Sequence, residues 1–188
     1  MVILWIILGI IVFLALYLIL TYNGLVRLNV RVEEAWSDIT VQLKRRYDLI
    51  PNLINTVKGY AKHERETLDS VTQARNLAQK ISTGGSVAAR SKAETELSSA
   101  LSRLLAVVEN YPDLKANQNF LALQEELAST ENKIGFSRQF YNDSVLRLNN
   151  QIQMFPSNVV AGMTGFKAEE FFEVSGTAER EAPKVSFS

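Results

Sequence analysis

The first twenty residues restrict the fold of this chain more than any other stretch. No charged side chain occurs in residues 1–20, and Gly9 is the only residue there that is not clearly apolar. A helix of about 20 residues rises about 30 Å, which matches the hydrocarbon core of a bilayer. Amphipathic aromatic rings are expected near the two ends of such a span, and the rings found there are Trp5, Tyr17 and Tyr22. The sequence therefore predicts a transmembrane anchor over residues 1–22.

A cleaved signal peptide is the alternative interpretation of this stretch. Such a peptide begins with a basic region and ends at small residues suited to cleavage. Here no Lys or Arg precedes the apolar run, and the run is followed by Thr21, Tyr22 and Asn23 rather than by small residues. These differences favour a retained single-pass anchor, with membrane lipid as its first partner.

The positions of the basic residues predict the orientation of the anchor. None precedes the span, whereas Arg27 and Arg31 follow it closely and the cluster Lys44-Arg45-Arg46 comes later. Basic residues flanking a span mark its cytoplasmic side. We therefore expect the N-terminus outside and the body of the protein in the cytoplasm. We expect Lys44-Arg45-Arg46 to form a solvated helix face.

The rest of the chain has helical periodicity almost throughout. Apolar residues recur at steps of three and four from Leu25 to Leu43, and the phase continues through Val57 to Leu68 and Ile81. The predicted fold is all-α: a transmembrane helix followed by an antiparallel bundle of three or four long helices over residues 23–156, of the coiled-coil or helical-bundle type.

The number of long helices depends on Pro51. A proline removes a backbone donor and disfavours helix at the preceding residue. The helix either kinks there and continues, or it reverses and restarts with Asp48 as its N-cap. The unbroken apolar phase and the absence of a nearby glycine favour continuation.

Three later features complete the predicted organisation. Residues 82–86 (Ser-Thr-Gly-Gly-Ser) interrupt the helix. A second helix ends at Pro112, and a third long helix ends at Pro156. Residues 157–188 are expected to form a partly ordered tail, because glycines recur among phenylalanines there. The predicted aromatic docking residues of this tail are Phe166, Phe171 and Phe172, with Phe187 further along.

Some charged residues fall on the apolar faces of the predicted helices: Glu64, Arg75, Glu131 and Arg138. Buried charges are costly unless they are paired. We expect an internal ion-pair network that fixes the register of the helices. The alternative is a functional polar pocket that binds a ligand or supports a reaction.

The sequence lacks the residues that most enzyme and metal sites require. The chain has no cysteine and one histidine, His63, so a di-metal Glu-x-x-His pair, a thiolate metal site and the His spacing of a zinc site are excluded. No phosphate-binding glycine loop or nucleophile-elbow motif occurs. Lys+Arg 20 balance Asp+Glu 20, which gives no basic excess for nucleic-acid binding. We therefore expect no enzymatic activity, no catalytic residues and no cofactor.

Several stretches together resemble the LemA family. They are Ala35-Trp36-Ser37-Asp38-Ile39, residues 42–53, residues 57–61, His63-Glu64, residues 111–116, residues 131–134, Arg138, Tyr141-Asn142, Val145, Leu148-Asn149 and Phe155-Pro156. The resemblance implies a bacterial membrane-anchored helical bundle without established enzymatic activity. It also makes a membrane metalloprotease of the HtpX type a candidate partner, and in magnetosome-forming bacteria it implies a part in shaping or assembling a membrane compartment.

Two functions follow from these observations. The first is a scaffold at the bacterial inner membrane that associates with itself into a homo-oligomer. The second is an adaptor or regulator of a membrane protein complex such as the protease, docking through the aromatic tail.

Overall fold

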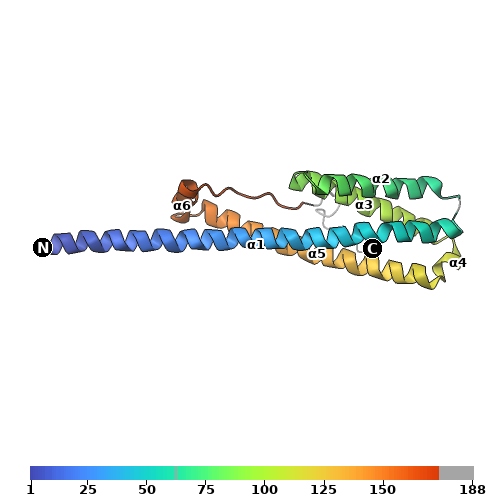
Figure 1. Cartoon of the computed structure of the whole chain (residues 1–188), viewed down its shortest axis with the longest axis horizontal. Coiled ribbons are helices and arrows are strands. Elements are labelled where there is room, and N and C mark those ends of the chain that lie inside the picture. The colour runs from blue at the N-terminus through green and yellow to red at the C-terminus, as the bar shows by residue number, and fades with distance from the viewer. Residues whose placement is uncertain (62, 174–188) are drawn as a thin grey trace, which may run out of the picture. The chain divides into compact units, whose positions relative to one another are not determined.

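A computed structural model describes residues 1–61 and 63–173 (Figure 1). The described chain is helical and contains no strand. Its helices are α1 (Val2–Tyr60), α2 (Arg65–Ser82), α3 (Val87–Val108), α4 (Pro112–Lys115), α5 (Gln118–Gln153) and α6 (Ser157–Thr164). The predicted all-α class is confirmed. The predicted docking residue Phe187 lies outside the described residues.

The helices pack as two units, and both α1 and α5 contribute to each. The first unit contains residues 1–41 and 133–171, and the second contains residues 42–132 with Phe172 onward. These units group residues that pack together. They do not test the predicted division into an anchor (1–22), a bundle (23–156) and a tail (157–188), which stays a prediction.

The first unit has its core where α1 and α5 face each other. Leu25, Val32 and Ile39 of α1 are at most 5% exposed, and so are Tyr141 and Val145 of α5. The predicted apolar stripe of α1 is therefore the buried one. The rings of Trp36 and Tyr141 lie 5.2 Å apart, a distance at which aromatic pairs add to the energy of burial.

The second unit contains the end of α1, all of α2, α3 and α4, and the start of α5, around a core of leucine, isoleucine and valine. The helix that enters from the anchor continues through Pro51 to Tyr60, so the predicted continuation is confirmed. The prediction that the same helix runs on to Leu68 is wrong. Helix α1 ends at Tyr60, and α2 begins at Arg65 and runs back alongside the end of α1 (Figure 1).

The connection between α2 and α3 lies at the predicted break. The backbone N–H of Gly85 donates to the carbonyl of Ile81 at 2.8 Å. A Cβ at position 85 would lie 2.5 Å from Cγ2 of Ile81, so the turn requires glycine at this position. The Ser86 hydroxyl then accepts from the N–H of Ala89 at 3.2 Å and caps α3.

Candidate functional site

The N-terminal third of α1 exposes its apolar side chains. The Leu, Ile, Val and Met side chains of residues 1–20 are 41% to 99% exposed. By length and composition, α1 is the one helix in the described chain that could cross a membrane. Of the predicted anchor aromatics, Trp5 is 68% exposed, Tyr22 is 44% exposed and Tyr17 is half-buried. Such an apolar surface is unstable in water and suits lipid.

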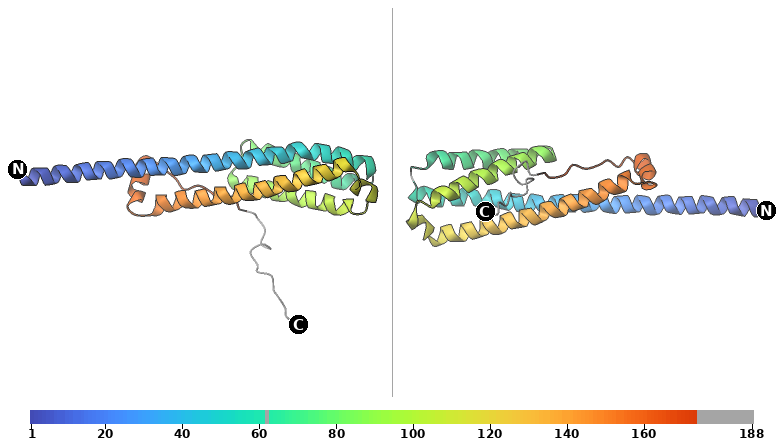
Figure 2. Two further views of the ribbon diagram at one scale, coloured as in Figure 1. Left: turned by 90° about the horizontal axis from the view of Figure 1, so that it is seen from below. Right: turned by 180° about the vertical axis from the view of Figure 1, so that it is seen from behind.

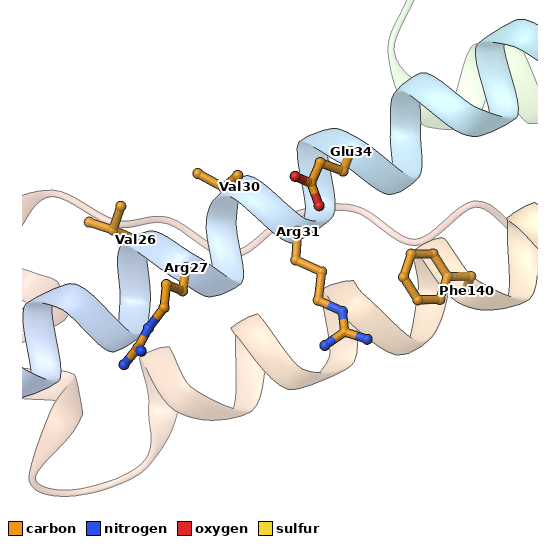
Figure 3. A pocket seen from close by; sticks show the side chains of 6 residues that line it. All are labelled: Val26, Arg27, Val30, Arg31, Glu34 and Phe140. Atoms are coloured by element: carbon orange, nitrogen blue, oxygen red, sulfur yellow. The ribbon is translucent and has the colours of Figure 1, made fainter.

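A cationic pocket follows this apolar segment on α1. It has a volume of about 440 Å³ and is lined by Val26, Arg27, Val30, Arg31, Glu34 and Phe140 (Figure 3). Arg27 and Arg31 point from α1 toward α5, whereas the two valines lie on the other side of the helix. The guanidinium carbon of Arg31 lies 5.3 Å from the centroid of the Phe140 ring, which holds this cation in place by a cation–π contact.

The segment after α6 is held by side chains that bind its backbone. Asn149 donates from Nδ2 to the carbonyl of Glu169 at 3.0 Å, and its Oδ1 accepts from the N–H of Glu169 at 2.9 Å. The Tyr141 hydroxyl donates to the carbonyl of Glu170 at 2.9 Å. Burial and the nearby carboxylates of Glu169 and Glu170 raise the pKa of Tyr141 to about 12.

The three predicted docking aromatics have different environments. The Phe166 ring lies 6.1 Å from the Tyr22 ring in an edge-on contact. Phe171 is 38% exposed, and Phe172 is 2% exposed. Phe171 is therefore the most accessible of the three to a partner.

The second unit contains a buried arginine that joins three helices. Arg46 of α1 is 2% exposed, and its guanidinium is ion-paired with the buried Glu94 of α3 and with Glu131 of α5, the latter at 2.6 Å. It also donates to the hydroxyl of Ser98 on α3 at 3.0 Å. The Tyr47 hydroxyl donates to the other oxygen of Glu94. We call Arg46, Tyr47, Glu94 and Glu131 the buried charge cluster.

The surroundings of Tyr47 favour its neutral form. Burial and the Glu94 carboxylate raise the pKa of Tyr47 far above its usual value, although Arg90 and Arg46 act in the opposite direction. A neutral tyrosine can donate to the carboxylate, and a tyrosinate could not. The cluster therefore contains a fixed donor, a buried cation and a buried anion, which is the arrangement that buried charge requires.

A second arginine bonds the carbonyl that Pro51 leaves without its helical partner. Proline has no N–H, so the carbonyl four residues earlier, that of Tyr47, loses its helical bond. Arg75 of α2 donates from Nε to this carbonyl at 2.7 Å. This bond explains how α1 continues through Pro51, because the orphaned acceptor is satisfied from a neighbouring helix.

The four charged residues predicted for an internal network are in different places. Glu64 is half-buried and accepts from the Tyr111 hydroxyl at 2.9 Å, which raises the pKa of that tyrosine. Arg75 binds the Tyr47 carbonyl, Glu131 is 47% exposed and pairs with Arg46, and Arg138 of α5 is half-buried. Of the four, Glu131 alone belongs to the buried charge cluster.

The sequence predicted that Lys44-Arg45-Arg46 forms a solvated helix face. This prediction is wrong for Arg46. Lys44 is exposed, and Arg45 is exposed and paired with Glu126. Arg46 is buried, because its position in the helix repeat falls on the core side between Leu43 and Ile50.

Sequence reasoning missed Arg46, Tyr47 and Glu94. The signal for Arg46 and Tyr47 was their spacing: residues 43, 46, 47 and 50 follow the same three-and-four pattern as the core. Glu94 lies three residues before the core residue Leu97 on α3. When only apolar residues are used to define the buried face of a helix, charged residues at the same positions are overlooked.

A pocket of about 290 Å³ adjoins the cluster. Arg46, Ser98, Gln124 and Glu131 are among its polar lining, and Leu53, Leu101, Leu105 and Leu127 are among its apolar lining. No group of three His, Asp or Glu side chains suited to a metal ion occurs in residues 1–61 and 63–173. His63 is exposed.

Comparison with known proteins identifies the family. The model of the LemA family matches residues 35–187. Magnetosome protein MamQ 2 of Paramagnetospirillum magneticum is 25% identical over 190 residues, which cover 89% of this chain and 70% of that protein. Magnetosome protein MamQ of Magnetospirillum gryphiswaldense is 24% identical, covering 82% of this chain and 65% of that protein.

A third relative is the protein LemA of Metamycoplasma hominis. It is 30% identical over 139 residues, which cover 74% of this chain and 63% of that protein. The family match includes the buried charge cluster, Pro51 and Arg75, and the residues that hold the segment after α6. The chain belongs to the LemA family.

Proposed function

We propose that this protein is a non-enzymatic helical scaffold, anchored in the bacterial inner membrane by residues 1–22 and associating with itself through its helices. The observation that carries the proposal is the exposed apolar segment of α1, which continues without interruption into the helices of both units. Two relatives are named as magnetosome proteins, which supports a role at a membrane.

The charge distribution supports a cytoplasmic body. Arg27 and Arg31 are the first charged side chains after the apolar segment, and both are exposed. Their position favours retention of this side in the cytoplasm. Protease treatment of intact spheroplasts should leave the body of the protein whole. Its degradation from outside would reverse the proposed orientation.

Self-association is supported by apolar side chains that the helices leave exposed. Phe136 and Phe140 lie one turn apart on α5 and are 73% and 39% exposed. Exposed apolar side chains that share a helix face commonly mark protein interfaces.

The test of self-association is the native mass of the full-length protein extracted in mild detergent and in nanodiscs, with and without residues 1–22. The scaffold proposal predicts a discrete oligomer in both lipid and detergent. A Phe136→Ser, Phe140→Ser variant should shift the mass toward the monomer, whereas the matched variant Val41→Ser should not. A monodisperse monomer of the unaltered chain in both media would reject the scaffold.

A second candidate is an adaptor for a membrane protein complex such as an HtpX-type metalloprotease. The supporting observation is that the segment after α6 is held through its backbone, which leaves the side chains of residues 167–171 exposed. Phe171→Ala should reduce co-purification of the protease while leaving the helical content unchanged. Unchanged co-purification would reject this candidate and leave the scaffold proposal intact.

A further inference from the structure

The end of α5, the following turn and α6 form a long stretch without charge. No charged residue occurs from Leu148 to Phe166, and the flanking residues, Arg147 and Lys167, are both basic. The stretch folds as a helix end, a turn and a short helix, so it does not cross a bilayer. Segments that lie at a membrane surface are held there by buried apolar area and by basic residues attracted to anionic headgroups.

Helix α6 is apolar on two sides. One side is buried in the protein and contains Ser157, Val160 and Ala161, each at most 3% exposed. The other side exposes Val159 at 52% and Met163 at 75%, which lie one turn apart. A surface helix normally has a polar side toward water. The outward side of α6 therefore suits an apolar environment.

The turn before α6 exposes two further large apolar side chains. Met154 is 60% exposed and Phe155 is 81% exposed, although methionine and phenylalanine are usually buried in folded proteins. We call Met154, Phe155, Val159 and Met163 the α6 stripe. Large apolar side chains gathered in this way on a soluble surface would promote aggregation.

Contacts within the first unit place α6 at the end of the apolar segment of α1. Phe166 follows α6 directly, and its ring contacts the ring of Tyr22. In residues 1–23, Tyr17 and Thr21 alone are half-buried. Both figures show α6 beside the blue N-terminal part of α1 (Figures 1 and 2). A bilayer around residues 2–20 would thus have its interfacial layer close to α6.

We propose that the α6 stripe is a second membrane contact, which inserts Phe155, Val159 and Met163 into the interfacial layer of the lipid leaflet nearest Tyr22. The inference rests on the proposed anchoring of residues 1–22. Lipid is the occupant because the stripe adjoins a segment that itself faces lipid, and because Arg147 and Lys167 can reach the headgroups on either side. Interfacial helices of this kind lie about 5–10 Å into the boundary between headgroups and acyl chains.

The absence of cysteine permits a direct test with the full-length chain. Single-cysteine variants Val159→Cys and Met163→Cys are labelled with an environment-sensitive fluorophore and placed in nanodiscs of phosphatidylethanolamine and phosphatidylglycerol. Quenching is measured with spin-labelled lipid and with a water-soluble quencher. Leu77→Cys is the matched control, because Leu77 is an apolar residue of α2 that is 43% exposed.

The proposal predicts several-fold stronger lipid quenching at positions 159 and 163 than at position 77, with the opposite order for the water-soluble quencher. Equal accessibility to water at all three positions would overturn it. Protection from both quenchers only in discs that hold more than one copy would identify a second chain as the occupant and would also overturn it.

A label at Leu8→Cys separates this inference from the proposed function. If position 8 is quenched by lipid and position 159 is not, the anchor stands and the second contact is rejected. If position 8 is not quenched, the anchor itself is rejected and so is the proposal that depends on it.

A substitution provides an independent measurement. Val159→Ser with Met163→Gln removes most of the apolar surface of the stripe, and both side chains are exposed, so the helical content should not change. Lipid quenching of a label at Phe155→Cys should then decrease several-fold, whereas Leu77→Ser should leave it unchanged. Undiminished quenching at position 155 would show that the stripe does not hold this turn in the lipid.

Discussion

Two stretches of α1 follow opposite rules. From Val2 to Leu20 the helix exposes large apolar side chains, and from Gln42 to Val57 it buries a charged one, Arg46. In the first stretch the solvent is inferred to be lipid, so no partner within the chain is needed. In the second stretch the cation is stable only because Glu94 and Glu131 come from α3 and α5. The role of the first stretch can be recognised from its own residues. The stability of the second stretch depends on residues that are distant in sequence.

The largest expected effect comes from charging the first stretch. Each arginine at the centre of a membrane span costs about 2.5–3.5 kcal/mol. Leu8→Arg with Ile11→Arg should therefore release the protein from membranes during alkaline carbonate extraction. Val41→Arg, at a position of the same helix that is 59% exposed, should leave membrane retention unchanged. Full retention of the double variant would contradict the anchor.

The next effect comes from removing the buried cation of the second stretch. Arg46→Ala removes the cation that is paired with the buried Glu94, and breaking a buried pair costs about 3–5 kcal/mol. The neighbouring substitution Arg45→Ala breaks an exposed pair with Glu126 and should cost no more than about 1 kcal/mol. Thermal unfolding of the two variants in detergent, followed by circular dichroism, measures the difference. Equal losses of stability would show that the burial of Arg46 is not what matters.

A smaller effect tests how α1 passes through Pro51. Arg75→Met removes the donor to the Tyr47 carbonyl and should cost about 1–3 kcal/mol in the free energy of unfolding. With Pro51→Ala, the backbone N–H at position 51 can bond this carbonyl, so the cost of Arg75→Met should shrink. A double-mutant cycle measured by denaturant unfolding gives the coupling. The same cost in both backgrounds would mean that Arg75 acts through another contact.

The smallest effect concerns alkaline pH and Tyr141. In the unfolded chain a tyrosine has a pKa of about 10, and in the folded protein the pKa of Tyr141 is about 12. Between these values the unfolded state loses its proton first, so the free energy of unfolding should fall as pH rises from about 10 to 12. The high pKa of Tyr47 acts in the same direction.

Denaturant unfolding of the unaltered chain and of Tyr141→Phe, at pH values on both sides of 10, measures this contribution. The variant should be less stable near neutrality, because it lacks the bond to the Glu170 carbonyl, and should lose less stability above pH 10. Parallel losses in both proteins would assign the alkaline decline to other groups.

The helices could largely be predicted from sequence because their signals are local. The apolar stripe from Leu25 to Leu43, the glycine turn before α3 and the end of α5 before Pro156 all depend on nearby residues. The break between α1 and α2 was missed because the apolar phase on its two sides nearly coincides, and no proline marks it.

The charged contacts could not be predicted in the same way. Glu131 was expected to be internal and does bind a buried arginine, but its partner is 85 residues away in sequence. Arg75 was expected on a core face, yet its acceptor is a backbone carbonyl, which no side-chain pattern reveals. Such pairings depend on which helices meet, and that information is not contained in the periodicity of either helix.

Three side chains form hydrogen bonds with the backbone of the segment after α6. Asn149 bonds Glu169, Tyr141 bonds Glu170, and Ser91 bonds Glu173. These bonds do not involve the side chains of the three glutamates. Substitutions of these three glutamates that keep the backbone groups should therefore preserve the hydrogen bonds. Glu169→Pro is the substitution that would break this contact, because proline has no N–H to donate to Oδ1 of Asn149.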